Sequence, residues 1–75
     1  MNFEVSYIEI GQRVKQLRKH QNLTQTEFAE EVSLDPKYIS RIELAKSKLG
    51  LCAVAKISRY MDVSTDYLIF GSKDD

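Results

Sequence analysis

Apolar residues along this chain recur at the three- and four-residue spacing of helices, and sustained strand-like alternation is missing. Ile10, Val14 and Leu17, for example, fall on one face of a helix. The pattern predicts an all-α bundle of five short helices, at about residues 8–20, 25–32, 36 onward, 51–61 and 65–70. Around them we expect an N-terminal arm (1–7), one compact domain (8–71) and a C-terminal tail (72–75).

Residues that favour helix N-termini stand before three of these segments. Thr24 is followed three residues later by Glu27, which is the capping-box pattern. Asp35 precedes Pro36, and a proline in the first helical position loses no hydrogen bond, because its N–H would have no partner there. Ser64 is placed to cap the last helix. The sequence therefore predicts defined starts for the second, third and fifth helices.

Helix ends often need a residue that tolerates the left-handed conformation. The residues at the expected ends of the first, second, fourth and fifth helices are Asn22, Ser33, Asp62 and Gly71. Serine is a poor choice, since a left-handed serine costs on the order of 1 kcal/mol. Ala45 does not favour this conformation either, so the third helix is expected to run on past residue 43.

The third helix has two distinct faces when it is plotted at about 100° per residue. Ile39 and Ile42 define the buried side. Lys37 and Arg41 point almost directly away from it, with Leu44 beside them. Ser40 and Tyr38 flank this outer strip, and Glu43 lies near the buried side. The helix is thus anchored by isoleucines and presents hydrogen-bond donors.

Composition excludes several other classes of protein. A chain of 75 residues allows one domain with a thin core. A single cysteine excludes an internal disulfide and fits a reducing compartment. The acidic start is not that of a signal peptide, and no apolar run approaches the roughly 18 residues that span a membrane. No nucleophile–base pair, phosphate loop or metal-ligand spacing is present, so we expect no catalytic residue, metal or cofactor.

The formal net charge is zero, but the charges are segregated along the chain. Residues 12–20 hold four Lys or Arg residues and no acid, and residues 36–48 hold four against the single acid Glu43. Residues 27–35 hold four acids and no cation. Because the local field decides how a polyanion binds, the two basic segments keep nucleic acid among the candidate partners.

The segment TQTEFAEEVSLDPKYISRIE resembles the helix-turn-helix of lambda-repressor/Cro-type (XRE-like) transcriptional regulators. IGQRVKQLRKHQNLTQ resembles the first helix of that family and the lead into its second, and DVSTDYLIFG resembles its closing helix. The resemblance covers residues 8–71. It implies a five-helix lambda-repressor-like domain whose third helix enters the major groove of duplex DNA.

The resemblance assigns roles to residues by position. Base readout is expected from Lys37, Tyr38, Ser40 and Arg41, and phosphate contacts from Thr24, Gln25, Lys46 and Lys48. Arg18 and Glu43 match a family pair that joins the first and third helices. For Tyr38 the equal alternative is packing on a neighbouring turn. Leu44 and Pro36 replace residues that commonly contact phosphate and base, so both of those contacts are expected to be lost.

These features predict a bacterial or phage-type regulator, a repressor in preference to an activator, that binds an inverted-repeat operator as a homodimer. The expected dimer surface is the apolar end of the chain, Tyr67, Leu68, Ile69 and Phe70. A regulatory protein is a further candidate partner. Such a protein would be cytoplasmic, and associated with the nucleoid when bound to DNA. The alternative is a protein-interaction module on the same scaffold, such as an antitoxin-type partner that neutralises a toxin.

Overall fold

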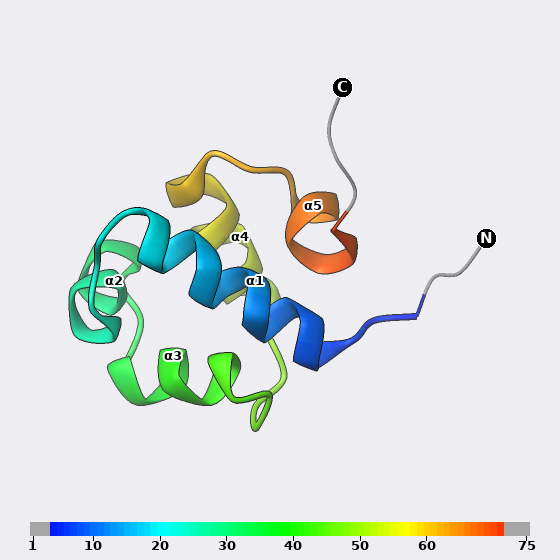
Figure 1. Cartoon of the computed structure of the whole chain (residues 1–75), viewed down its shortest axis with the longest axis horizontal. Coiled ribbons are helices and arrows are strands. Elements are labelled where there is room, and N and C mark those ends of the chain that lie inside the picture. Colours follow the sequence, from blue (N-terminus) through cyan, green and yellow to red (C-terminus); the bar gives the residue numbers. More distant parts are fainter. Residues whose placement is uncertain (1–3, 72–75) are drawn as a thin grey trace.

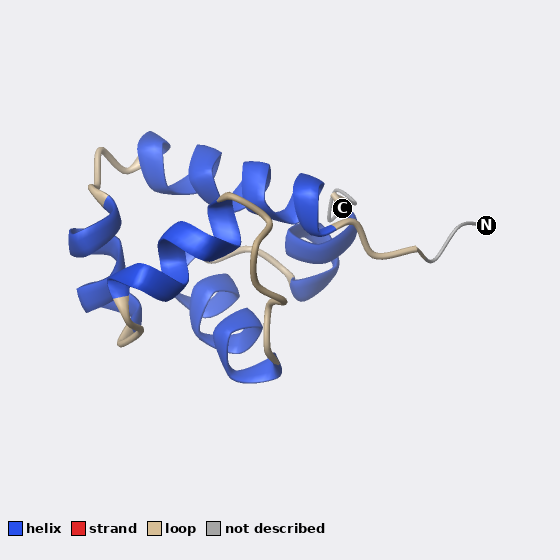
Figure 2. Ribbon diagram, turned by 90° about the horizontal axis from the view of Figure 1, so that it is seen from below, coloured by secondary structure: helices blue, strands red, loops and turns tan. Residues whose placement is uncertain are grey.

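The computed structural model describes residues 4–71, which form helices joined by short turns (Figure 1). The helices are α1 (Tyr7–His20), α2 (Gln25–Val32), α3 (Pro36–Glu43), α4 (Leu51–Met61) and α5 (Thr65–Phe70). Figure 2, in which strands would be red, shows none among these residues. The all-α prediction is therefore confirmed. Residues 1–3 of the expected arm and the expected tail, residues 72–75, lie outside the described part of the chain.

Helix α1 begins one residue earlier than expected. Ser6 is its N-cap, and the Ser6 hydroxyl accepts a hydrogen bond from the N–H of Glu9 at 3.3 Å. Ser6 was not predicted as a cap, whereas the predicted caps are present: the Asp35 carboxylate accepts from the N–H of Lys37 at 2.8 Å, and Ser64 caps α5. These local hydrogen bonds satisfy N–H groups that have no partner within a helix, which is why the sequence could predict them.

The five helices enclose one hydrophobic core. Helix α3 packs mainly on α1 and α2, whereas α5 lies against α1 and α4. Each fully buried aliphatic or aromatic side chain contributes about 1.5–3 kcal/mol. Because α3 is held from one side, its opposite side remains open to solvent. The largest side chains with no more than 2% exposure are Phe28, Ile10, Ile39, Ile42, Ile57, Leu68 and Val14.

Four helices end at or next to a left-handed residue, at the positions that the sequence indicates. Asn22, Ser33, Asp62 and Gly71 have φ of +59°, +56°, +55° and +74°. Ser33 forms the turn between α2 and α3, and the N–H of the next residue, Leu34, donates to the carbonyl of Ala29 at 2.9 Å. This tight turn sets α3 directly against α2.

The expectation that α3 continues past residue 43 is wrong. The helix ends at Glu43, and Ala45 adopts a left-handed φ of +59°. The N–H of Lys46 then donates to the carbonyl of Arg41 at 2.8 Å, which closes the helix end. A left-handed alanine costs about 1–2 kcal/mol. Just beyond the turn, Leu49 packs against the core, and this packing offsets the cost. Residue propensity alone does not reveal such a contact.

Helices α1 and α3 are in close contact at Gly11. A Cβ atom at this position would meet the carbonyl oxygens of Ile42 and Glu43, the latter at 3.0 Å, so backbone would have to move. Gly11 lies inside α1 and is buried. It is therefore the missing side chain, rather than an unusual φ, that lets α1 lie on the C-terminal turn of α3.

Candidate nucleic-acid interface

Helix α3 presents the strip of donors that its helical wheel predicts. Ile39 and Ile42 are 0% and 2% exposed, whereas Lys37 and Arg41 face solvent. Leu44, directly after the helix, is 61% exposed. Two long cationic side chains thus project from a helix whose other side is fixed in the core.

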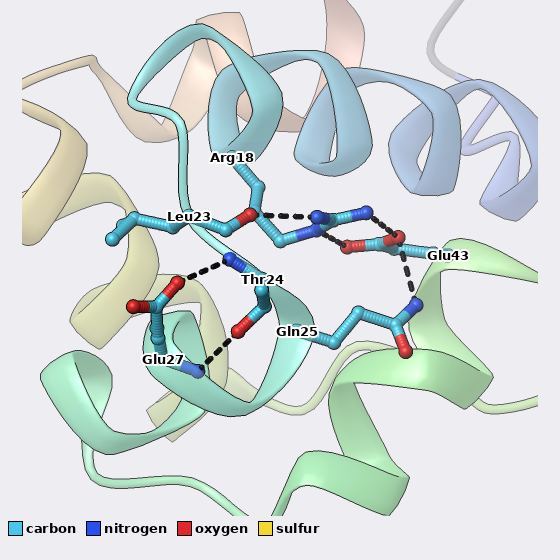
Figure 3. Close-up of polar contacts among 6 residues, drawn as sticks. All are labelled: Arg18, Leu23, Thr24, Gln25, Glu27 and Glu43. Carbon is cyan, nitrogen blue, oxygen red and sulfur yellow. Dashed lines mark hydrogen bonds and ion pairs between the residues drawn. The ribbon is translucent and has the colours of Figure 1, made fainter.

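An ion-pair network fixes the C-terminal end of α3 (Figure 3). The Arg18 guanidinium donates from Nε to Glu43 Oε2 at 2.7 Å and from Nη2 to Oε1 at 3.0 Å. Its Nη1 donates to the carbonyl of Leu23 at 2.8 Å. The Gln25 amide donates to Glu43 Oε1 at 3.1 Å. The Glu43 carboxylate therefore joins α1, α2 and α3, and the Arg18 guanidinium adds the turn after α1.

This pair is shielded from water, which strengthens it. The side chains of Arg18 and Glu43 are only 10% and 3% exposed. Hydrogen bonding to Glu43 raises the pKa of Arg18; burial lowers it by less, and the charge of Glu43 raises it further. Because the pKa of Arg18 is raised, the contribution of its guanidinium to stability is retained up to the ordinary arginine pKa. This contribution is lost in more strongly alkaline solution.

The N-terminus of α2 is rigid and stands beside this network. The Thr24 hydroxyl accepts from the N–H of Glu27 at 3.1 Å, and the Glu27 carboxylate accepts from the N–H of Thr24 at 2.9 Å (Figure 3). This is the predicted capping box. The link from Gln25 to Glu43 was not expected from the sequence, since the two residues are 18 positions apart. It fixes the N-terminus of α2 relative to the end of α3.

The other predicted site residues are distributed around α3. Lys46 and Lys48 are exposed in the loop between α3 and α4. Ser40 is half-buried on the side of the helix. Tyr38 is also half-buried, and its hydroxyl donates to the carbonyl of Lys48 at 3.1 Å and accepts from the N–H of Gly50 at 2.9 Å. Tyr38 thus contacts the loop between α3 and α4. This corresponds to the alternative that the sequence left open, packing on a neighbouring turn.

Only part of the predicted dimer surface is exposed in the structure. Leu68 is 0% exposed within one chain, and Ile69 packs partly against the core. Leu68 is therefore a core residue and is not available to a second chain. Tyr67 remains half-buried, and Phe70 is 41% exposed. The apolar surface of α5 is smaller than its sequence implies.

Arg13 is a structural residue that the sequence reasoning missed. Its Nε donates to the carbonyl of Leu68 at 2.9 Å and its Nη2 to that of Ile69 at 2.9 Å. The guanidinium thereby satisfies carbonyls at the end of α5 and joins that helix to α1. A side chain on Gly71 would meet it, with Nη1 2.8 Å from the added Cβ. No local pattern signals a contact across 55 residues.

Among residues 4–71 no group of three or more His, Cys, Asp or Glu side chains could hold a metal ion. No helix within the same range has the length and apolar character needed to cross a membrane.

Helix α2, the turn at Ser33 and α3 together form a helix-turn-helix, with the outer face of the second helix open. Such an arrangement defines a class of DNA-binding domain. The sequence matches the family described as Helix-turn-helix over residues 14–68. The chain therefore belongs to the helix-turn-helix family, of the lambda-repressor/Cro (XRE-like) type. It is a DNA-binding transcription regulator and not an enzyme.

Individual relatives agree with this assignment. Control protein C.MunI of Mycoplasma sp is 36% identical over 62 residues, which cover 81% of this chain and 84% of that protein. The restriction-modification controller protein C.AhdI of Aeromonas hydrophila is similar in structure, with a TM-score of 0.77 and 25% identity over 84% of this chain and 96% of that one.

The regulator SinR is a third similar protein. The N-terminal DNA-binding domain of SinR from Bacillus subtilis has a TM-score of 0.77 and 33% identity, covering 84% of this chain and 91% of that one. A crystal structure of SinR in complex with DNA has a TM-score of 0.72 and 35% identity, covering 79% and 95%. The similarity thus extends over most of α1–α5.

Proposed function

We propose that this regulator binds a specific duplex operator by inserting α3 into the major groove. The observation that carries the proposal is the exposed pair Lys37 and Arg41 on a helix whose inner side is fixed by Ile39, Ile42 and the buried carboxylate of Glu43. Arg41 can donate two hydrogen bonds to O6 and N7 of a guanine. SinR, similar along most of the chain, has been solved with DNA, which supports the same docking here.

Phosphate contacts on both sides of α3 set its depth and register in the groove. Thr24 and Gln25 lie at the N-terminus of α2, where N–H groups without helical partners favour an anion. Lys46 and Lys48 lie in the loop after α3. These contacts carry no sequence information, but they make binding dependent on salt. Binding would place the protein on the nucleoid, in the cytoplasm.

We further propose that the protein acts as a homodimer on an inverted repeat whose half-sites lie about 34–36 Å apart. The exposed ring of Phe70, with Tyr67 beside it on α5, is the candidate contact between copies. Two copies double the number of phosphate contacts, which offsets the zero net charge of one chain. A dimer bound over a promoter would repress by occlusion.

Replacing Arg41 with alanine should relax base preference at one base pair of each half-site. The loss of binding free energy should be about 1–3 kcal/mol for duplexes with the preferred base and much smaller for the others, because only the preferred base accepts two hydrogen bonds from Arg41. Competition binding to duplexes that vary one position at a time measures this. The control is Arg59→Ala, which removes the same charged group from the last turn of α4. An equal loss on every base would show that Arg41 contacts phosphate instead.

Replacing Phe70 with aspartate should weaken self-association at least tenfold, because a charge would have to enter the apolar contact. Sedimentation equilibrium without DNA measures the dimer dissociation constant. Leu51→Asp is the control, since Leu51 is 84% exposed and lies on α4, outside the proposed contact. If both variants dimerise like the original protein, the interface lies elsewhere.

A further inference from the structure

The hydroxyl of Tyr38 already has partners for both of its strong hydrogen-bonding roles. It donates its one proton to the carbonyl of Lys48 at 3.1 Å, and it accepts from the N–H of Gly50 at 2.9 Å. A phenol has a single O–H to give. To donate to a base or a phosphate, Tyr38 would have to release Lys48.

The contact with Gly50 takes the place of one of the two hydrogen bonds of a capping box, the one that binds the N–H of the N-cap residue. Gly50 is the N-cap of α4 and has no side chain with which to cap it. In α2 the N–H of the N-cap residue, Thr24, is bound by Glu27 of the same helix. In α4 the corresponding N–H is bound by Tyr38, which belongs to α3. Tyr38 therefore fixes the start of α4 from outside that helix.

This link is significant because α3 and α4 have little direct packing between them. Helix α3 packs mainly on α1 and α2. The loop from α3 to α4 is also attached at its start, where the N–H groups of Ala45 and Lys46 donate to carbonyls at the end of α3. Further along, Leu49 packs against the core. The Tyr38 hydroxyl holds the main chain on both sides of Leu49. Lys48 is thus positioned by Tyr38, whereas Lys46 is positioned by the end of α3.

We propose that Tyr38 is a positioning residue for the phosphate contact of Lys48, and not a reader of bases. This inference rests on the proposed DNA-binding function. The phenol holds the main chain of Lys48 and the first turn of α4 at a fixed distance from the recognition helix. The Lys48 ammonium can then meet the DNA backbone while Lys37 and Arg41 meet the bases. Tyr38 therefore affects affinity for every sequence equally.

The test is Tyr38→Phe, which keeps the ring and removes only the hydroxyl. We expect the affinity for DNA to fall about fivefold, which is the effect of losing one or two hydrogen bonds. The fall should be the same on a selected operator and on a shuffled duplex. The dependence of affinity on salt should decrease by about the slope of one phosphate contact for each chain of the dimer, matching Lys48→Ala. In a Lys48→Ala background, Tyr38→Phe should cost less than twofold. In a Lys46→Ala background, the full fivefold loss should remain.

Two results would overturn the inference. One is a changed preference at a single base position in Tyr38→Phe, which would make the hydroxyl a base reader. The other is an undiminished loss in the Lys48→Ala background. Amide hydrogen exchange without DNA gives an independent readout. The N–H of Gly50 should exchange faster in Tyr38→Phe, because it loses its hydrogen-bond partner. An unchanged rate would contradict the contact between Tyr38 and Gly50. The original protein could bind neither duplex while the exchange of the Gly50 N–H still becomes faster in Tyr38→Phe. In that case the proposed function fails, and the contact of Tyr38 with Gly50 is purely structural.

Discussion

Replacing Arg18 with methionine should lower the free energy of unfolding by about 3 kcal/mol, the largest effect that we expect from a single substitution. Methionine fills similar space but leaves the carboxylate of Glu43 buried and without its cation. Breaking one partner of a buried ion pair costs about 3–5 kcal/mol. The lower end applies here, because the side chain of Arg18 retains 10% exposure and Gln25 still donates to Glu43.

Urea unfolding followed by circular dichroism measures this change, and two variants make it specific. Lys19→Met removes a neighbouring cation that is exposed on the same helix, and its effect should stay within about 0.5 kcal/mol. The double variant Arg18→Met with Glu43→Leu should be more stable than Arg18→Met alone, because no charge is then left buried. A loss below about 1 kcal/mol in Arg18→Met would mean that the pair is not a structural support of α3.

Replacing Gly11 with alanine should destabilise the protein by about 2 kcal/mol, in spite of the higher helix propensity of alanine. The added methyl group would meet the carbonyl oxygens of Ile42 and Glu43, which are main-chain atoms and cannot rotate away. Overfilling a packed contact costs about 1–3 kcal/mol. Because the displaced residues end α3, the variant should also bind operator DNA less tightly at temperatures where it remains folded.

Gly50→Ala is the matched control for this substitution. A Cβ atom at Gly50 has only the Tyr38 hydroxyl within 4 Å, at 3.6 Å, and φ is −69°, which alanine adopts readily. Thermal unfolding of both variants should show a larger fall in Tm for Gly11→Ala than for Gly50→Ala, where alanine is only a less favoured N-cap than glycine. If Gly11→Ala is as stable as the original protein, α1 and α3 do not pack as closely as described.

The parts of this structure that the sequence predicted are those governed by local rules. The capping box at Thr24 and the proline after Asp35 act within one helical turn, so neighbouring residues are sufficient to identify them. The buried and exposed sides of α3 follow from helical periodicity alone. For the same reason Lys37 and Arg41 were placed correctly on the outer face.

The parts that the sequence did not predict depend on residues far apart in the chain. Ala45 is left-handed although its own propensity opposes that conformation. Leu68 looked available for a dimer because its burial depends on helices that sequence periodicity does not position. The phenol of Tyr38 and the guanidinium of Arg13 have carbonyl partners 10 or more residues away. Such contacts follow from how the helices pack, and local patterns in one sequence do not predict them.

The most direct test of the central claim, that α3 reads an operator, is selection from a pool of random duplex DNA at two or more salt concentrations. We expect enrichment of an inverted repeat whose half-sites are centred about one helical turn apart, with affinity falling as salt rises. Arg41→Ala in the same selection should lose one enriched base pair in each half-site. Failure to enrich any palindromic sequence, together with binding that does not respond to salt, would contradict the account.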